Sequence, residues 1–207
     1  MAVRPCWAID GRSNNGKTTL AARISELVPR SVVIHTDDIA WAHSRFGWAD
    51  LLIDGILVPV HHGQAVRYRP PRWDEHGREG SIEVPADCPL LIIEGDGAGR
   101  REAAHLIDIV IWVQADERET KRRAIARAAN RPAADLANRA VDGTPFDEEG
   151  WMAEEIPFNA AQRTWERADL IVCGTPEIPC DPSAEIVIAP PVTFPHRGGP
   201  WSGICAE

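Results

Sequence analysis

Residues 9–20 read Ile9-Asp10-Gly11-Arg12-Ser13-Asn14-Asn15-Gly16-Lys17-Thr18-Thr19-Leu20 and follow the spacing G-x-x-x-x-G-K-[ST]. A mostly apolar run, residues 6–10, leads into this stretch, and apolar residues at helical spacing, Leu20, Ile24 and Leu27, follow it. A strand, a glycine-containing loop and a helix in this order form the context in which the pattern binds phosphate groups. The sequence therefore predicts a phosphate-binding loop (P-loop) between the first strand and the first helix.

Each residue type in this loop has a physical reason to be there. Glycine lets the backbone pass close to phosphate oxygens, so that successive N–H groups converge on one anion, and the positive end of the helix dipole adds to the attraction. Lys17 supplies a mobile cation for the β- and γ-phosphates, and the Thr18 hydroxyl is a ligand for Mg²⁺. We therefore expect ATP and Mg²⁺ as cofactors. We expect the nucleotide to be bound by Gly11, Ser13, Asn14, Asn15, Gly16, Lys17, Thr18 and Thr19.

Short apolar runs alternate with helical stretches along the rest of the chain. The further strands are predicted at residues 31–35, 90–94, 107–113 and 170–173, and the helices at residues 16–27, 49–57, 117–129 and 148–166. Strands that alternate with helices indicate a parallel sheet covered on both faces. We predict an α/β, three-layer P-loop NTPase fold with a five-stranded, mostly parallel sheet, helices on both faces and a small inserted β-hairpin, formed by residues 65–69 and 81–84.

We expect residues 1–207 to form a single domain with three special regions. These are an inserted, acceptor-binding subregion over 41–88, an arginine-rich lid over 117–131 and a coil tail over 189–207. An edge strand is expected near residues 185–188, before the tail. The helix predicted over 49–57 is expected to be interrupted at Pro59.

Charge and composition exclude several functions. The 207 residues include 22 Lys plus Arg and 31 Asp plus Glu, which gives a formal net charge of −9, whereas a nucleic-acid binder needs a basic face to replace the counterions of the phosphates. The most apolar runs are too short to span a bilayer, and the N-terminus shows no apolar signal core. We therefore expect a cytoplasmic protein that binds neither nucleic acid nor membrane, and the sequence leaves a homo-oligomer open.

Carboxylates follow two of the predicted strands. Glu94 ends the run 90–94, where it would emerge beside the P-loop and hold hydrated Mg²⁺; an ordinary strand-end glutamate is the alternative. Asp37 and Asp38 follow the second strand, where a carboxylate could accept the proton of an attacking hydroxyl and help to ligate Mg²⁺. We take Asp37 as the candidate base and Mg²⁺ ligand, with Asp38 as the alternate base, and either could instead cap the next helix.

The predicted helix over 117–129 is rich in arginine. Arginines over the phosphates of a small kinase stabilise charge on the transferring group and exclude water. We select Arg123 and Arg127 for this role, with a solvated charged face as the alternative. The sequence has no guanine-binding N-K-x-D clamp, no ABC signature and too little length for a helicase core, which leaves the small-molecule and nucleotide kinases.

The ordered set of these segments resembles the uridine kinase-like branch of the P-loop kinases, which is related to phosphoribulokinase and pantothenate kinase. The matching segments are the P-loop run, Asp37-Asp38, residues 91–95, the helix over 118–127 and the passage 162–172, so that the resemblance covers residues 5–175. It implies a kinase that phosphorylates a hydroxyl of a small molecule. Gly174 and Thr175 are similar to the backbone loop that cups adenine in this fold.

The inserted hairpin departs from that family where the family contacts its nucleoside. Ile39 and Ala40 stand in place of an aromatic pair, and the spacing within residues 72–78 differs. Planar and polar side chains of the insertion could still stack on a base or read its polar edge and a sugar hydroxyl. The candidates are Asp38, Tyr68, Trp73, Asp74, His76 and Arg78. For Trp73, stacking on the acceptor and pinning the hairpin to the core stay equally open.

A nucleoside is therefore the first acceptor we expect, followed by a sugar, vitamin or antibiotic hydroxyl. A nucleoside monophosphate kinase would need a further arginine cluster, for which Arg45, Arg67, Arg69 and Arg72 are irregularly placed candidates. An alternative of another class is a regulatory module that binds ATP without catalysis. Such a module needs no base at Asp37.

Overall fold

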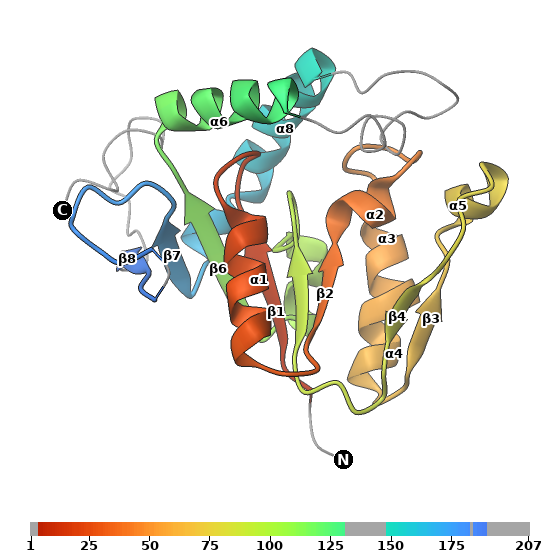
Figure 1. The fold of residues 1–207 in the computed structure, drawn as a ribbon. Coiled ribbons are helices and arrows are strands. Elements are labelled where there is room, and N and C mark those ends of the chain that lie inside the picture. Colours follow the sequence, from red (N-terminus) through yellow and green to blue (C-terminus); the bar gives the residue numbers. More distant parts are fainter. Residues whose placement is uncertain (1–3, 131–147, 183, 190–207) are drawn as a thin grey trace.

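The computed structural model describes residues 4–130, 148–182 and 184–189. Within these residues, six strands form the central sheet, in the order β2-β5-β1-β6-β7-β8 (Figure 1). Its strands are β1 (Cys6–Asp10), β2 (Val32–His35), β5 (Leu91–Glu94), β6 (Ile109–Gln114), β7 (Leu170–Cys173) and β8 (Val187–Ala189). The first five of these are parallel, which confirms the predicted α/β class, and β8 pairs antiparallel with β7. The predicted number of five is wrong because the expected edge strand joins this same sheet.

Both faces of the sheet are buried. Successive side chains of a strand point to opposite faces, and in β5 the residues Leu91 and Ile93 belong to one buried cluster while Ile92 belongs to the other. Helix α1 (Lys17–Leu27) covers the second cluster with Leu20 and lies in front of the strands in Figure 1. Burial on both faces explains why these strands appear in the sequence as continuous apolar runs.

The insertion over 41–88 lies beside β2, at the edge of the sheet (Figure 1). Its helical part runs from α3 (Ala49–Leu52) through a π-helical turn (Ile53–Leu57) into α4 (Val58–His61). The predicted interruption at Pro59 is therefore wrong. Proline is tolerated at the first positions of a helix, where its missing N–H is not needed, and Pro59 stands there, directly after the π turn.

The rest of the insertion is the predicted hairpin. Strands β3 (Val66–Tyr68) and β4 (Ile82–Val84) pair antiparallel. The short helix α5 (Pro71–Glu75), which the sequence analysis did not predict, stands between them.

Two further helices lie at the end of the sheet where the parallel strands end (Figure 1). Helix α6 (Glu117–Ala129) has the predicted bounds. Helix α8 (Glu148–Gln162) ends before the predicted residue 166, because Arg163 adopts a left-handed conformation with φ of 48°. Shorter helices are α2 (Thr36–Ala40), η2 (Arg101–Leu106) and η3 (Thr164–Glu166).

Some expectations concern parts of the chain outside the described residues. These are residue 131 of the predicted lid and the predicted coil tail beyond residue 189. Within the ranges that are described, none of the helices has the length and apolar character required to cross a bilayer.

Gly11 passes unusually close to a neighbouring strand. Its φ is 141°, and a β carbon there would lie 2.3 Å from the carbonyl oxygen of Val113 in β6. We expect Gly11→Ala to lower the free energy of unfolding by about 2–5 kcal/mol through backbone strain and overpacking, as measured by urea denaturation. Gly77→Ala is the matched control, because Gly77 also has a positive φ but nothing within 4 Å. If both variants lost the same free energy of unfolding, the positive φ alone would explain the effect, and the close approach to Val113 would contribute nothing.

Candidate active site

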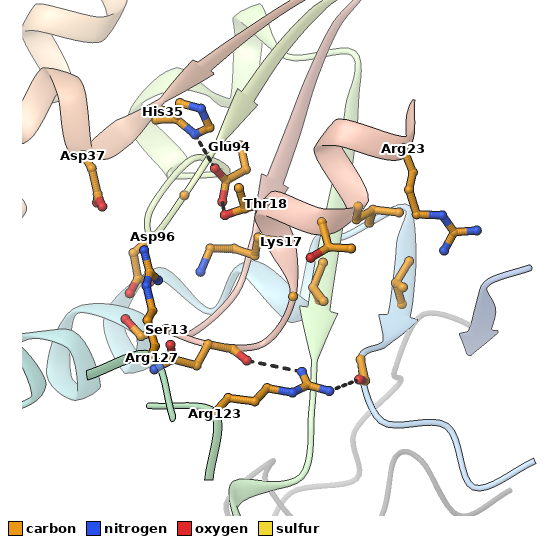
Figure 2. A pocket seen from close by; sticks show the side chains of 18 of the residues that line it. Ser13, Lys17, Thr18, Arg23, His35, Asp37, Glu94, Asp96, Arg123 and Arg127 are labelled. Atoms are coloured by element: carbon orange, nitrogen blue, oxygen red, sulfur yellow. Dashed lines mark hydrogen bonds and ion pairs between the residues drawn. The ribbon is translucent and has the colours of Figure 1, made fainter. Parts of the chain in front are cut away.

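A cavity of about 1150 Å³ lies where the P-loop, β2 and β5 end (Figure 2). The predicted site residues that line it are Ser13, Asn14, Gly16, Lys17, Thr18, Thr19, Asp37, Asp38, Arg78, Glu94, Arg123, Arg127 and Gly174. The predicted residues that do not line it are Gly11, Asn15, Tyr68, Trp73, Asp74, His76 and Thr175. The structure thus brings the phosphate loop, the three candidate carboxylates and the two selected arginines together at one cavity.

The phosphate loop has the conformation of an anion nest. Asn14 and Gly16 are left-handed, with φ of 63° and 104°, and such residues next to right-handed ones turn successive N–H groups toward one point. Helix α1 begins at Lys17, so its positive end is directed to the same place. Lys17 is only 8% exposed, and its ammonium donates to the carbonyl oxygen of Arg12 at 3.0 Å. The loop therefore has the backbone angles and the helix position that an anionic ligand would need.

Two polar side chains hold this loop from beneath. The fully buried Asp10 carboxylate accepts hydrogen bonds from the backbone N–H groups of Gly11, Gly97 and Gly99 at 2.7, 2.9 and 3.0 Å. Burial raises the pKa of Asp10, and these hydrogen bonds offset only part of that rise. The side-chain amide of Asn15 donates to a backbone carbonyl of β6 at 2.9 Å, and its backbone N–H donates to the carbonyl oxygen of Arg12 at 3.3 Å, so that both groups stabilise the loop itself.

Thr18, Glu94 and His35 form a chain of hydrogen bonds at the edge of the cavity (Figure 2). The Thr18 hydroxyl donates to one carboxylate oxygen of Glu94 at 3.1 Å, and the other oxygen lies 2.6 Å from Nδ1 of His35. Burial raises the pKa of Glu94, but the hydrogen bond to His35 and the charge of Lys17 bring it below its usual value. The same hydrogen bond is the main cause of the raised pKa of His35. Glu94 is therefore ionised.

These oxygen donors fit a partly hydrated Mg²⁺. Mg²⁺ at phosphate-transfer sites keeps several waters and takes one or two carboxylates together with substrate phosphates, and Thr18, Glu94 and Asp37 all line the cavity. Within the described residues there is no group of three or more His, Cys, Asp or Glu side chains able to hold a metal by itself. Phosphate oxygens and water would therefore have to complete the shell.

Asp37 and Asp38 lie in the first turn of α2, and His35 takes the capping position that was the alternative for them. The side chain of Asp38 pairs with Arg78, and its backbone carbonyl accepts the indole N–H of Trp73 at 2.9 Å. Asp37 is exposed at the cavity. Asp38 thus anchors the insertion, whereas Asp37 is directed toward the space in front of Lys17 (Figure 2).

Trp73 and Tyr68 pack inside the insertion. Trp73 is 4% exposed and belongs to the hydrophobic core. Tyr68 lies over Gly55, where a β carbon would be 2.5 Å from its ring. The observed positions match the pinning alternative for Trp73, and neither ring reaches the cavity lining.

The other hairpin candidates divide between the surface and the cavity. Asp74 pairs with Arg69 at 2.7 Å, and the His76 ring meets the Trp41 ring edge-on at a centroid distance of 5.9 Å. The Arg78 guanidinium stacks 3.8 Å from the centroid of Trp73 and 5.2 Å from that of Trp41. Trp41 and Arg78 thus contact each other in the part of the insertion that lines the cavity, to which Ala42, His43 and Arg45 also belong.

Arg123 connects the lid helix to both sides of the predicted nucleotide site. Its guanidinium donates to the carbonyl oxygens of Asn14 at 3.3 Å and Gly174 at 2.8 Å (Figure 2), and Glu119 pairs with it at 2.9 Å. Gly174 approaches the P-loop so closely that a β carbon would lie 2.2 Å from the carbonyl oxygen of Asn15. The Thr175 hydroxyl accepts the backbone N–H of Asp116 at 2.9 Å, at the start of α6.

Several residues of this site were not predicted from the sequence. Asp96, His35, Trp41 and Trp151 also line the cavity, and so does Arg45, which was named only as a candidate for a nucleoside monophosphate kinase. His35 could have been found from the strand pattern, because it and Glu94 are the last residues of neighbouring parallel strands. No sequence pattern indicated Trp151, which comes from the distant helix α8.

The P-loop between β1 and α1 on a parallel sheet, with carboxylates at the ends of β2 and β5, places the chain in the P-loop class of nucleotide-binding folds. No protein-family model matches the chain, and no curated protein matches it in sequence.

Solved structures resemble it at low identity. A protein from Bacillus stearothermophilus described as a "possible uridine kinase" is 20% identical, with 83% of this chain and 89% of that chain covered and a TM-score of 0.43. A candidate fructose transport system kinase from Silicibacter sp. TM1040 is 18% identical, with 81% and 87% covered and a TM-score of 0.45. TT1252 from Thermus thermophilus is 17% identical, with 85% and 91% covered and a TM-score of 0.46. At these identities and TM-scores, the resemblance to the solved structures carries no functional argument, and the proposed function rests on the residues of this chain.

Proposed function

We propose that the protein is a kinase that uses ATP and Mg²⁺ and transfers the γ-phosphoryl group to a hydroxyl of a small molecule, with a nucleoside as the first acceptor to test. The observation that carries the proposal is the shared cavity: the P-loop and Asp37 line the same space. Phosphoryl transfer needs this arrangement, because the acceptor oxygen must reach the γ-phosphorus in line with the leaving oxygen.

The residues divide into three roles. The P-loop N–H groups and Lys17 hold the β- and γ-phosphates, and Arg123 and Arg127 neutralise charge on the transferring group from the lid side. Asp37 orients the attacking hydroxyl and accepts its proton. Bound Mg²⁺, held through Thr18, Glu94 and Asp37, would supply electrostatic stabilisation of the phosphate oxygens.

The insertion supplies the acceptor side. Trp41 and Arg78 offer an aromatic ring and a fixed planar donor at the cavity, which suits a planar, polar acceptor such as a nucleoside. Asp38 keeps Arg78 in place. Trp73 lies under Arg78 and His76 meets Trp41, so both support this surface from outside the cavity.

A screen of ATP consumption tests the proposal. The acceptors are nucleosides, nucleoside monophosphates, sugars and aminoglycoside-like alcohols, each with MgATP and with MgGTP. We expect acceptor-dependent turnover that is largest with a nucleoside. Turnover with another hydroxyl compound and with no nucleoside would overturn the acceptor assignment. MgATP binding without acceptor-dependent turnover would favour the regulatory module instead.

A further inference from the structure

One stripe of α8 docks against the outer side of the phosphate loop. One carboxylate oxygen of Glu155 accepts the backbone N–H of Ser13 at 2.8 Å, and the other lies 3.3 Å from two guanidinium nitrogens of Arg12. One turn earlier, the indole N–H of Trp151 donates to the Ser13 hydroxyl at 3.2 Å. One turn later, Asn159 donates to the loop that follows β5 at 3.1 Å. The spacing i, i+4, i+8 places all three on one face of the helix.

Glu155 holds the loop from behind. It is 1% exposed and is not among the cavity-lining residues. Burial raises its pKa, but contact with the carboxyl of Asp96, the hydrogen bond from Ser13 and the charge of Arg12 outweigh burial and lower it, whereas the pKa of Asp96, which is buried beside Glu155, is raised. A buried, ionised carboxylate is strongly destabilised when it loses its partners. The Ser13 N–H therefore stays directed at Glu155, and this hydrogen bond fixes the orientation of the Ser13 peptide. The residue after Ser13, Asn14, is one of the two left-handed residues of the phosphate loop.

The same helix also contacts the insertion. Glu154 pairs with Arg45 at 2.6 Å. The Phe158 ring stacks on Phe46 with centroids 4.2 Å apart and an interplanar angle of 17°. Arg45 and Phe46 both belong to the insertion over 41–88. Neighbouring residues of α8, Glu154 and Glu155, therefore contact the two halves of the proposed active site.

We propose that Glu155 is a positioning residue that holds the phosphate loop in its phosphate-binding conformation and ties it, through α8, to the insertion. The link to an acceptor rests on the proposed function, whereas the effect on the loop does not. When a binding-competent conformation is only partly populated, the apparent affinity falls in proportion to its population. Loss of the Glu155 carboxylate lets the segment Arg12–Asn14 leave the nest conformation, and phosphate affinity then falls.

Calorimetric binding of MgATP and of inorganic tripolyphosphate, without any acceptor, tests this role. We expect Glu155→Ala to weaken both affinities by about tenfold, the size expected for the loss of a hydrogen bond to a charged group. Glu155→Gln keeps an oxygen for the Ser13 N–H and should weaken them by about threefold. The matched control is Glu154→Gln, one residue away on the same helix, which should bind both probes as the wild type does.

Unchanged affinities in Glu155→Ala would overturn the inference, and so would an equal loss in Glu154→Gln, because that result indicates a general effect on α8. If circular dichroism shows that Glu155→Ala does not fold, the affinities of Glu155→Gln are compared with those of Glu154→Gln. Equal affinities in these two variants would then overturn the inference. A wild-type protein that binds MgATP and phosphorylates no acceptor contradicts the kinase proposal and leaves this comparison intact. A wild type that binds neither probe overturns both.

Discussion

Asp37→Asn is expected to lower kcat by about a thousandfold while the affinity for MgATP falls much less, by about tenfold or less, because Thr18 and Glu94 still hold the proposed Mg²⁺. General acid–base catalysis contributes about 10²–10⁴-fold to a rate, and an amide cannot accept the proton of the acceptor hydroxyl. The substitution keeps the shape of the side chain. Turnover measured with the best acceptor, together with calorimetric titration of MgATP, separates the chemical step from nucleotide binding.

The structure supplies a matched control for this variant. Asp38→Asn changes the next residue, which also lines the cavity but is paired with Arg78. We expect it to raise the acceptor KM several-fold through loss of a partly exposed ion pair and to lower kcat much less than Asp37→Asn does. The reverse order of effects would make Asp38 the base. Normal turnover in both variants would contradict an aspartate base at the end of β2.

The fold could be predicted from the sequence because its signals are local. The P-loop pattern, the apolar strands and the periodic helices each act over a short stretch, and the parallel sheet follows from their alternation. Proline 59 and the count of strands were predicted incorrectly for different reasons. A π turn before Pro59 lets the helix continue, and whether a short edge strand such as β8 joins the sheet depends on pairing with β7, a contact that no local pattern encodes.

The residues that line the P-loop side of the cavity were also predictable, since they are consecutive or end neighbouring strands. The lining that the insertion contributes was not. Trp73 and Tyr68 have the residue types of a base-stacking pocket, but which way an aromatic ring of a hairpin points depends on long-range packing, here against the core and Gly55. Glu155 was missed because its partners, Arg12 and Ser13, are more than 140 residues away in the sequence. Tertiary contacts of this kind determine which residues surround the cavity, but no short stretch of the sequence indicates them.

Removal of the Lys17 ammonium should have the other large effect. Lys17→Ala is expected to weaken MgATP binding by about a hundredfold and to lower kcat/KM by about a thousandfold or more, because the transferring phosphoryl group loses its fixed cation. Carboxylates of Glu94 and Asp37 line the same cavity. Without the lysine, a polyanionic nucleotide would meet these charges in a partly desolvated site, where charge–charge energies are larger than in water.

Lys121→Ala is the control for this variant, because Lys121 is the only other lysine of the chain. It lies on the surface of α6, with its side chain 66% exposed and paired with Glu117 at 2.8 Å. Exposed pairs of this kind contribute about 0–1 kcal/mol, so we expect nucleotide affinity and turnover to stay close to the wild type. Lys17 also lowers the pKa of the buried Asp10, and its removal should reduce the thermal stability of the ligand-free protein. A Lys17→Ala variant that binds MgATP normally would show that the loop does not hold the β- and γ-phosphates, and the kinase proposal would fail with it.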